Sequence, residues 1–390
     1  MKLEELFAER ARDARTTSWG DDPSGDVVSL AFGLADQSRF PREELIEAAA
    51  AAMADGGGRM LNYAGPDAHL IEQIVARLRR EGVDAHAEQV LLGYGSSEIL
   101  NVLPAVLVEP GDPVIVEAPT FVGAVGRFAA SGARLIGVPV GPLGMDLDAL
   151  EQTLATLKDQ RQRAKFIYAI PTFHNPTGAT MPLAQRERLV ALAAAYGTLI
   201  VEDDAYGELR FQGEHLPPLA ALSSDWVLRV STFSKILAPG LRLGYAHGPL
   251  PLIQRLSAFK TSGGSGPFLT AMVANYSADG RLDAHIVELC ELYARKCATM
   301  IAAIKREFPA SVSYLVPDGG FFIWCTLPAG ISATELAQHA LECGVEILPG
   351  PRCYAGGGGD SNFRLAFSQQ PEERIAEGIT RLGKAIRDLI

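Results

Sequence analysis

Seven short apolar runs, separated by helical patterns, constrain most strongly what this chain can fold into. Each run spans four to six residues and is rich in Val, Ile and Leu at successive positions, which is typical of strands buried on both faces of a sheet. A helical pattern at residues 69–81 precedes the first run, and helical patterns at residues 146–158 and 183–196 lie between later runs. This alternation predicts crossover connections and an α/β fold with a mostly parallel, seven-stranded sheet between helices. The runs are residues 89–92, 113–117, 135–140, 166–170, 198–202, 227–230 and 243–246.

The pattern changes beyond about residue 280. The helical patterns become longer, and runs that alternate apolar and polar residues replace the continuous apolar ones. This favours a second, smaller α+β domain. The helical patterns there are residues 282–308, 332–343 and 371–390, and the alternating runs are residues 321–327, 346–348 and 363–367.

At 390 residues the chain is long enough to bury two hydrophobic cores. We therefore expect a large domain over residues 51–280 and a small domain over residues 281–390. Residues 1–50 are expected to form an N-terminal segment that joins the small domain.

Charge and composition disfavour several classes of protein. No apolar run approaches the ~20 residues that span a bilayer, and residues 1–15 lack the apolar stretch of a secretory signal, so we expect a cytoplasmic protein. The net charge of −11 disfavours binding to nucleic acid or to anionic membranes. The five cysteines form no Cys-x-x-Cys pair and the seven histidines show no metal-binding spacing. Neither disulfides nor a metal site is therefore indicated.

Polar motifs follow several of the predicted strands, where ligands gather in open parallel sheets. The sequence Gly-Tyr-Gly-Ser-Ser-Glu at residues 93–98 opens a predicted helix. Its small residues and the free amides of the helix N-terminus are suited to a phosphate. A plain turn from strand to helix would have the same sequence, so this motif alone decides nothing.

Two further motifs hold a polar residue at a strand end. The turn Pro-Thr-Phe-His-Asn-Pro-Thr-Gly at residues 171–178 fixes Asn175, which either binds a ligand or satisfies its own turn. The sequence Glu-Asp-Asp-Ala-Tyr at residues 202–206 closes an apolar strand with acids. A carboxylate buried there needs a polar partner such as a protonated heterocycle, whereas a solvated acidic loop is the alternative.

The sharpest motif surrounds Lys235. Hydroxyl residues Thr232 and Ser234 precede this lysine, and Arg242 follows it by seven residues. A lysine in a partly desolvated site loses its proton more easily and becomes a nucleophile toward an aldehyde. Thr232, Ser234 and Arg242 together are able to hold a dianionic phosphate. The apolar flanks of the motif disfavour a simple surface lysine.

Together these motifs resemble the class I/II aminotransferases of pyridoxal 5′-phosphate (PLP) fold type I, from about residue 28 to the C-terminus. The likeness is greatest to the branch that contains 2-aminoadipate and kynurenine aminotransferases. The motifs Asn-Pro-Thr-Gly, Glu-Asp-Asp-Ala-Tyr and Ser-Lys-x-x-Ala-Pro-Gly-x-Arg-x-Gly occur in the same order with matching gaps. The resemblance implies a PLP enzyme that moves an amino group from an L-amino acid to a 2-oxo acid by a ping-pong mechanism. It also implies that the large domain binds the cofactor.

The resemblance assigns a role to each candidate residue. Lys235 would carry PLP as a Schiff base and shuttle the proton, with Asp203 on the ring nitrogen. Asn175 and Tyr206 would bind the phenolic oxygen, and Phe121 would stack on the ring. The residues expected to hold the phosphate are Ser96, Ser97, Thr232, Ser234 and Arg242, together with Tyr63 of a neighbouring subunit.

The resemblance also implies a homodimer with active sites at the interface. Arg364 matches the arginine that binds the substrate carboxylate, and Gly33 and Asn175 would assist it. The glycine-rich residues 261–267 are expected near the cofactor of the partner subunit. The substrate side chain is expected to meet Phe32, Tyr94, His174 or Tyr354; His174 either acts on the substrate or packs, and we favour packing.

The sequence leaves one alternative to transamination open and disfavours two others. The same scaffold supports β- or γ-elimination, replacement or carbon–carbon bond formation in a specialised pathway. Some transcription regulators carry an aminotransferase-like domain as a sensor, but this sequence shows no basic N-terminal extension of the size that a DNA-binding module needs. A nicotinamide-dependent dehydrogenase is disfavoured because no Gly-x-Gly-x-x-Gly turn follows the first strand.

Overall fold

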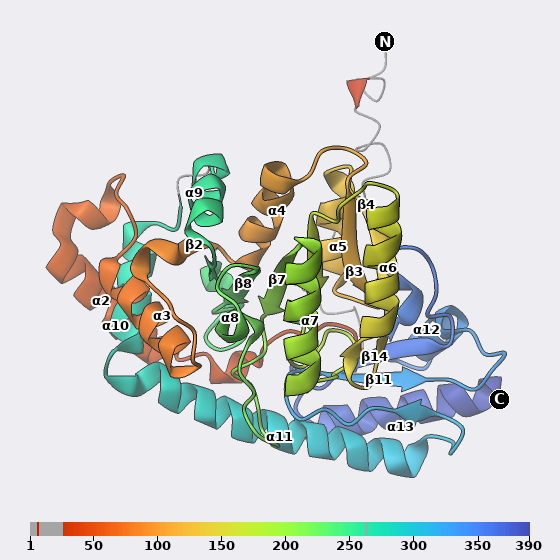
Figure 1. The fold of residues 1–390 in the computed structure, drawn as a ribbon. Coiled ribbons are helices and arrows are strands. Elements are labelled where there is room, and N and C mark those ends of the chain that lie inside the picture. The colour runs from red at the N-terminus through yellow and green to blue at the C-terminus, as the bar shows by residue number, and fades with distance from the viewer. Residues whose placement is uncertain (1–5, 8–25, 262–263) are drawn as a thin grey trace.

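The computed structural model describes residues 6–7, 26–261 and 264–390. Its centre is a sheet of eight strands in the order β2-β9-β8-β7-β6-β3-β4-β5 (Figure 1). The strands are β2 (Val90–Tyr94), β3 (Pro113–Ala118), β4 (Arg134–Gly141), β5 (Gly144–Met145), β6 (Phe166–Ala169), β7 (Leu199–Asp204), β8 (Val227–Thr232) and β9 (Leu243–His247).

All seven predicted strands are present, and the sheet is mostly parallel as expected. The expected count of seven was wrong by one, because β5 adds two residues that turn back antiparallel onto β4. Strand β9 lies antiparallel between β2 and β8. The sequence does not reveal this direction, because an apolar strand buried on both faces reads the same either way.

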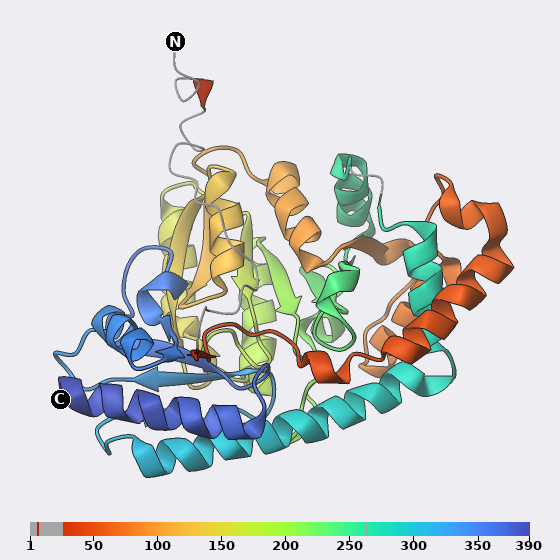
Figure 2. The ribbon, with the colours of Figure 1, turned by 180° about the vertical axis from the view of Figure 1, so that it is seen from behind.

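Helices cover both faces of the sheet, which is why its strands are largely apolar. Val114 and Val116 of β3 pack into one cluster with α4, α5 and α9, whereas Ile115 packs into the other cluster with α3, α6 and α7. Figure 2 shows the side with α4 and α5 toward the viewer, and Figure 1 shows α6 and α7 in front. The helices are α3 (Ala68–Arg80), α4 (Ser96–Leu107), α5 (Val122–Ala130), α6 (Leu147–Asp159), α7 (Leu183–Tyr196), α8 (Leu219–Leu222) and α9 (Leu250–Phe259).

A second, smaller sheet lies beside the first and has the order β10-β11-β14-β13, with antiparallel pairs. The long helix α11 runs beneath both sheets, and α13 lies along it (Figure 1). Near the N-terminus, β1 (Val28–Ser29) pairs in parallel with β12 (Val345–Glu346). The other elements are β10 (Ser313–Tyr314), β11 (Phe322–Thr326), β13 (Leu348–Pro349), β14 (Asn362–Ala366), α11 (Arg281–Glu307), α12 (Ala333–Glu342) and α13 (Glu372–Leu389). The domain boundaries at residues 50 and 280 stay predictions.

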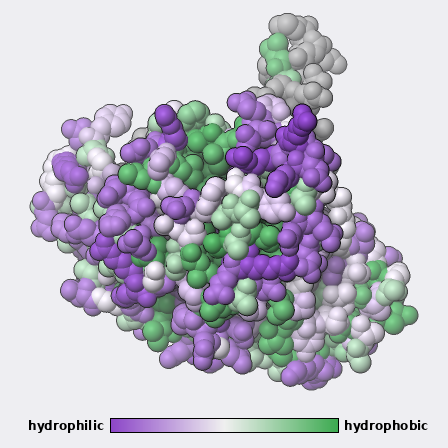
Figure 3. All heavy atoms as spheres, viewed as in Figure 1, coloured by the Kyte–Doolittle hydropathy of each residue, from purple (hydrophilic) through white to green (hydrophobic). Residues whose placement is uncertain are grey.

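A helical arm formed by α2 (Arg42–Gly56) and η3 (Gly57–Leu61) packs against α10 (Pro267–Ser277) at one end of the molecule (Figures 1 and 2). On the face seen in Figure 3, hydrophilic and hydrophobic residues are interspersed. Among the described residues, no helix is both long enough and apolar enough to cross a membrane.

Candidate active site

The polar motifs that follow β2, β6, β7 and β8 meet at one edge of the large sheet. Strands β6, β7 and β8 are parallel neighbours, and β2 has the same direction because both it and β8 pair antiparallel with β9. Their carboxyl ends therefore lie on the same edge. The small sheet contributes Arg364 from β14 to this region.

Lys235 follows β8, and its amine is held in a desolvated environment. Nζ donates a 2.8 Å hydrogen bond to the carbonyl of Gly33 and lies 5.8 Å from the centre of the Tyr206 ring. Burial, together with the nearby positive charges of Arg364 and Arg242, lowers the pKa of Lys235 to about 8. A fraction of this amine is therefore neutral and nucleophilic near pH 7.

Asp203, near the end of β7, has one oxygen occupied and one without a partner. Tyr168 of β6 donates a 2.5 Å hydrogen bond to Oδ2, while the buried Oδ1 makes no hydrogen bond to any described residue. Burial raises the pKa of Asp203 to about 6. An unpaired oxygen on a buried carboxylate is costly, so a protonated ring nitrogen at Oδ1 would stabilise this site.

The turn after β2 and the loop after β8 form a cup of small and basic residues. Gly95 has φ +70°, a conformation that favours glycine. A Cβ there would come within 2.9 Å of Nη2 of Arg242. Ser96 and Ser97 then open α4 with their backbone amides, and a helix N-terminus of this kind favours an anion.

Thr232 at the end of β8 and Ser234 in the loop that follows lie together. The hydroxyl of Thr232 donates to the carbonyl of Leu243 at 3.1 Å and lies 2.9 Å from Oγ of Ser234. The backbone amide of Ser234 donates to Oγ of Thr232. Because the Thr232 proton is used within the loop, this residue positions Ser234; its direct contact with a phosphate stays a prediction.

Arg364 and Asn175 are in contact although 189 residues separate them. Nη1 of Arg364 donates to Oδ1 of Asn175 at 2.8 Å, and Nη2 donates to the carbonyl of Ala31. The guanidinium group also lies 4.2 Å from the centre of the Phe322 ring. The arginine is thus oriented before any substrate arrives, and its buried Nε has no partner among the described residues.

Arg186 of α7, which is 1% exposed, stabilises the loop that carries Asn175. Its guanidinium donates to the carbonyls of Pro171, Met181 and Pro217 and to the hydroxyl of Thr172. The sequence analysis missed this residue, because an arginine on a helix reads as a surface charge. We found no sequence signal that would have identified it.

His174 packs rather than facing the site, in line with the preferred interpretation of the sequence. Its ring is fully buried, with Nδ1 2.8 Å from the hydroxyl of Thr177 and Nε2 3.1 Å from Oε2 of Glu117. It therefore does not line a substrate pocket. The other candidates keep accessible surface; Phe32 is 43% exposed and Tyr94 39%.

Three further predicted residues have distinct surroundings. Phe121 precedes α5 and is half-buried. Tyr206 is buried against the rings of Phe321 and Phe322. Tyr63, which follows the helical arm, is fully exposed. Of the glycine-rich stretch, residues 262 and 263 lie outside the described part of the chain.

These observations fit PLP. The cofactor would find an amine for its aldehyde at Lys235, an unpaired carboxylate oxygen for its ring nitrogen at Asp203, and an anion cup for its phosphate at Gly95 and Arg242. The sequence analysis overlooked Tyr168, the partner of Asp203. A tyrosine inside an otherwise apolar strand was the available signal, because a buried hydroxyl requires a partner.

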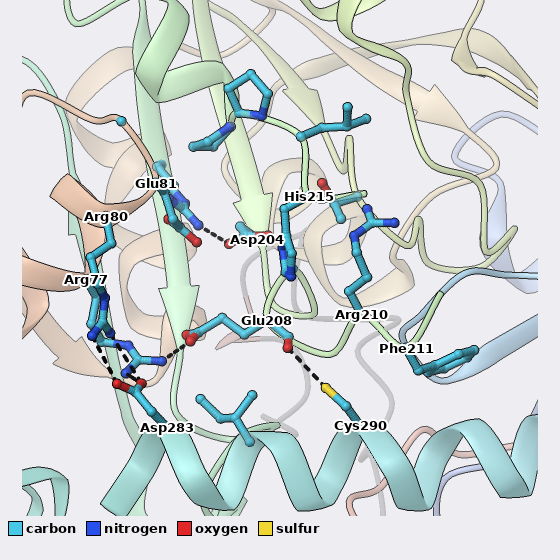
Figure 4. A pocket seen from close by; sticks show the side chains of 18 of the residues that line it. Arg77, Arg80, Glu81, Asp204, Glu208, Arg210, Phe211, His215, Asp283 and Cys290 are labelled. Carbon is cyan, nitrogen blue, oxygen red and sulfur yellow. Dashed lines mark hydrogen bonds and ion pairs between the residues drawn. The ribbon is translucent and has the colours of Figure 1, made fainter. Parts of the chain in front are cut away.

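A separate cavity of about 1110 Å³ lies between α3, the loop after β7 and α11 (Figure 4). Charged side chains of both signs line it and pair with one another. Arg77 pairs with Glu208 and Asp283, and Arg229 pairs with Asp204. These pairs tie α3 and α11 to the large sheet, so we interpret the cavity as part of a structural junction.

Comparison with known proteins agrees with this geometry. Residues 26–382 match the family described as aminotransferase class I and II. The chain is 36% identical to 2-aminoadipate transaminase of Thermus thermophilus, over 93% of this chain and 91% of that protein. It is 34% identical to aromatic-amino-acid aminotransferase 1 of Thermococcus litoralis, over 94% and 89%. The solved α-aminoadipate aminotransferase of Thermus thermophilus, complexed with N-(5′-phosphopyridoxyl)-L-leucine, superposes with a TM-score of 0.92 at 34% identity, covering 100% of this chain and 99% of that one.

Proposed function

This chain belongs to the class I and II aminotransferase family, and from that premise we propose which residues carry its reaction and which amino acids it takes. The protein is a PLP-dependent aminotransferase. The observation that carries the assignment of the site is the meeting of Lys235, the free Oδ1 of Asp203 and the Gly95–Arg242 cup at one sheet edge.

In the proposed site the ring nitrogen of the cofactor pairs with Asp203, and its phosphate is held by Arg242, Ser234 and the amides that open α4. Asn175 and Tyr206 bind the phenolic oxygen, and Phe121 covers the ring. When bound, PLP carries the amino group between the two substrates and withdraws electrons from the substrate Cα.

The protein residues then orient the substrate and move one proton. Arg364 binds the substrate carboxylate through its guanidinium, which Asn175 and the Ala31 carbonyl already hold in place. Nζ of Lys235 takes the proton from the substrate Cα. The lowered pKa of this amine leaves a fraction of it neutral and able to accept the proton. The carbonyl of Gly33 accepts a hydrogen bond from this amine and keeps it in position.

We propose that the preferred amino donor has a large apolar or aromatic side chain. Trp324 and Leu348 pair with Arg364 across the small sheet and therefore lie on the same face as the carboxylate-binding group. Phe32 and Tyr94 are the exposed aromatic residues nearest in sequence to Gly33 and Gly95. An apolar lining of this kind favours apolar side chains over a second carboxylate.

A panel of single-turnover half-reactions tests this proposal. The PLP form is mixed with one amino acid at a time, and conversion to the pyridoxamine form is followed by absorbance. We expect phenylalanine, tyrosine and leucine to react at least tenfold faster, per unit concentration, than aspartate and 2-aminoadipate. A clear preference for the dicarboxylates would refute the proposed donor class without affecting the assignment of the cofactor site.

We further propose a homodimer in which Tyr63 reaches the phosphate of the partner subunit. Supporting this, Tyr63 and Leu61 are among the most exposed large hydrophobic side chains of the described residues, and Ile46 and Met53 of α2 add to an apolar surface on the same arm. Tyrosine at an interface supplies both apolar area and a hydroxyl donor. Light scattering of the purified protein is expected to give twice the 41.7 kDa chain mass, and a monomer would refute this assembly.

We propose that the protein is located in the cytoplasm. All five cysteines are free in the structure, as is usual for proteins of reducing compartments. Fractionation of cells that express the protein at native level tests this assignment.

A further inference from the structure

Tyr168 is a polar residue in the middle of an apolar strand. The other residues of β6 are Phe166, Ile167 and Ala169, and the whole strand is buried. Tyr168 itself is 0% exposed. A hydroxyl in such a place needs a partner, and its partner is Oδ2 of Asp203 at 2.5 Å.

The sheet and a helix fix the position of this tyrosine. Tyr168 pairs with Val201 of β7, two residues before Asp203, so both side chains lie on the same face. On that face the ring of Phe128 from α5 packs edge-on against Tyr168, with 5.4 Å between the ring centres. The core therefore holds the hydroxyl, and the hydroxyl in turn holds the carboxylate.

The two oxygens of Asp203 are consequently different. Oδ2 accepts the Tyr168 hydrogen bond, whereas the buried Oδ1 has no hydrogen-bond partner among the described residues. A carboxylate that is free to rotate would offer either oxygen to a ligand. With Oδ2 occupied, only Oδ1 is left.

Charged groups around Asp203 act in opposite directions. Burial raises its pKa most, and the negative charges of Asp204 and Glu117 raise it further; the Tyr168 hydrogen bond and the positive charge of Arg127 lower it. Arg127 of α5 is partly buried, donates to the carbonyl of Gly123 and also interacts electrostatically with Tyr168. Tyr168 and Arg127 together favour the ionised carboxylate.

We propose that Tyr168 is a positioning residue: its hydroxyl holds Oδ2 of Asp203 so that Oδ1 is reserved for the nitrogen of the cofactor ring. The inference rests on the role proposed above for Asp203. Tyr168 touches neither substrate nor cofactor and acts only through the carboxylate. Its loss should therefore affect recognition of the ring nitrogen and leave recognition of the phosphate intact.

The test compares two ligands on the variant Tyr168→Phe. The first is pyridoxamine 5′-phosphate, and the second is its analogue in which carbon replaces the ring nitrogen. Dissociation constants are measured by equilibrium dialysis against the apoprotein at pH 7. Because a hydrogen bond to a charged group is involved, we expect pyridoxamine phosphate to bind about tenfold more weakly, and the analogue to change by less than about twofold. Equal weakening of both ligands, or no weakening, would overturn the proposal.

The pH dependence gives a readout that a packing role would not change. Binding of pyridoxamine phosphate should weaken as pH falls through the pKa of Asp203, about 6 in the wild-type protein. Without the Tyr168 hydrogen bond this pKa rises, so the midpoint should move to higher pH in the variant. The free ligand titrates identically in both experiments, so a difference in midpoint reports the paired carboxyl group and ring nitrogen in the protein. An unchanged midpoint would contradict the inference.

Three more variants complete the design. Tyr276→Phe removes another buried tyrosine hydroxyl, from α10, and should leave both dissociation constants unchanged. If Tyr168→Phe fails to fold, Arg127→Met is measured in its place. This variant should move the midpoint in the same direction by a smaller amount, and an unmoved midpoint would refute the claim that Tyr168 and Arg127 favour the ionised carboxylate. Asp203→Asn separates the two ideas: if this substitution weakens both ligands equally or neither, the proposed role of Asp203 is wrong, whereas selective weakening of pyridoxamine 5′-phosphate by Asp203→Asn but not by Tyr168→Phe refutes only the role of Tyr168.

Discussion

Nη1 of Arg364 lies 2.8 Å from Oδ1 of Asn175. The residue proposed to bind the substrate carboxylate is therefore held against the residue proposed to bind the phenolic oxygen of the cofactor. Arg364 comes from the small sheet and Asn175 from the loop after β6 of the large sheet. A substrate bound by Arg364 would be aligned with the cofactor through this contact.

Replacing Arg364 should impair recognition of the carboxylate far more than the chemistry. We expect Arg364→Gln to raise KM for the amino donor about a hundredfold, because two charge-assisted hydrogen bonds are lost, with a change in kcat of less than about tenfold. The measurement is steady-state kinetics with the best donor of the panel. The matched control is the same donor without its carboxylate: the slow half-reaction of that amine should not respond to the substitution. A similar loss with both compounds would place the carboxylate elsewhere.

The phosphate cup should not tolerate a side chain at Gly95. Gly95→Ala places a Cβ about 2.9 Å from Nη2 of Arg242 at a φ of +70°, so both strain and a displaced arginine are expected. We predict at least tenfold weaker binding of pyridoxamine 5′-phosphate, measured by dialysis. Gly126→Ala, where a Cβ meets open space in α5, should bind as the wild type does. Unchanged affinity in Gly95→Ala would show that the phosphate lies elsewhere.

Capture of the cofactor by the apoprotein should depend on pH through Lys235. The pKa of this amine is lowered to about 8, and only the neutral form attacks an aldehyde. The rate of covalent attachment of PLP should therefore rise about tenfold per pH unit below pH 8 and level off above it, which stopped-flow absorbance measures. Pyridoxamine 5′-phosphate forms no bond to Lys235 and should show no such limb. A plateau that begins near pH 10 would mean that the lysine is not desolvated.

Replacing Arg186 should destabilise the protein, because this residue donates hydrogen bonds to the loop that carries Asn175. Arg186→Met leaves the buried carbonyl of Met181 without its donor and removes one of the two donors to the carbonyl of Pro171, and we expect the free energy of unfolding to fall by about 3 kcal/mol. Urea unfolding of the apoprotein measures this change. The control Arg188→Met, on the exposed side of the same helix, should cost less than about 1 kcal/mol. Equal effects would mean that the buried contacts contribute little.

The sequence predicted those parts of the fold that local pattern determines. The helix expected at residues 183–196 coincides with α7, and the apolar runs mark the strands within two residues. Strand direction could not be predicted as well from the sequence. The antiparallel direction of β9 is seen only in its pairing with β2 and β8, and β5 is too short to show periodicity.

The residues of the candidate site also divide into those that the sequence identifies and those that only the structure identifies. Lys235, Asp203 and Arg364 stand in motifs whose chemistry the sequence displays, and the structure brings them to one edge of the sheet. Tyr168 acts through a contact with Asp203, 35 positions away in the sequence, and Arg186 acts through contacts with residues up to 31 positions away. Such contacts exist only after the strands and helices have packed, so residue type alone could not identify the partners of these two side chains.

The most direct test of this account asks where the cofactor is attached. The PLP-loaded protein is reduced with borohydride, digested and analysed by mass spectrometry, with Lys235→Ala treated in parallel. We predict a single pyridoxyl-modified peptide that contains Lys235, and no modified peptide in the variant although it still binds pyridoxamine 5′-phosphate. Attachment at another of the chain's lysines, or an equally modified variant, would contradict the central claim.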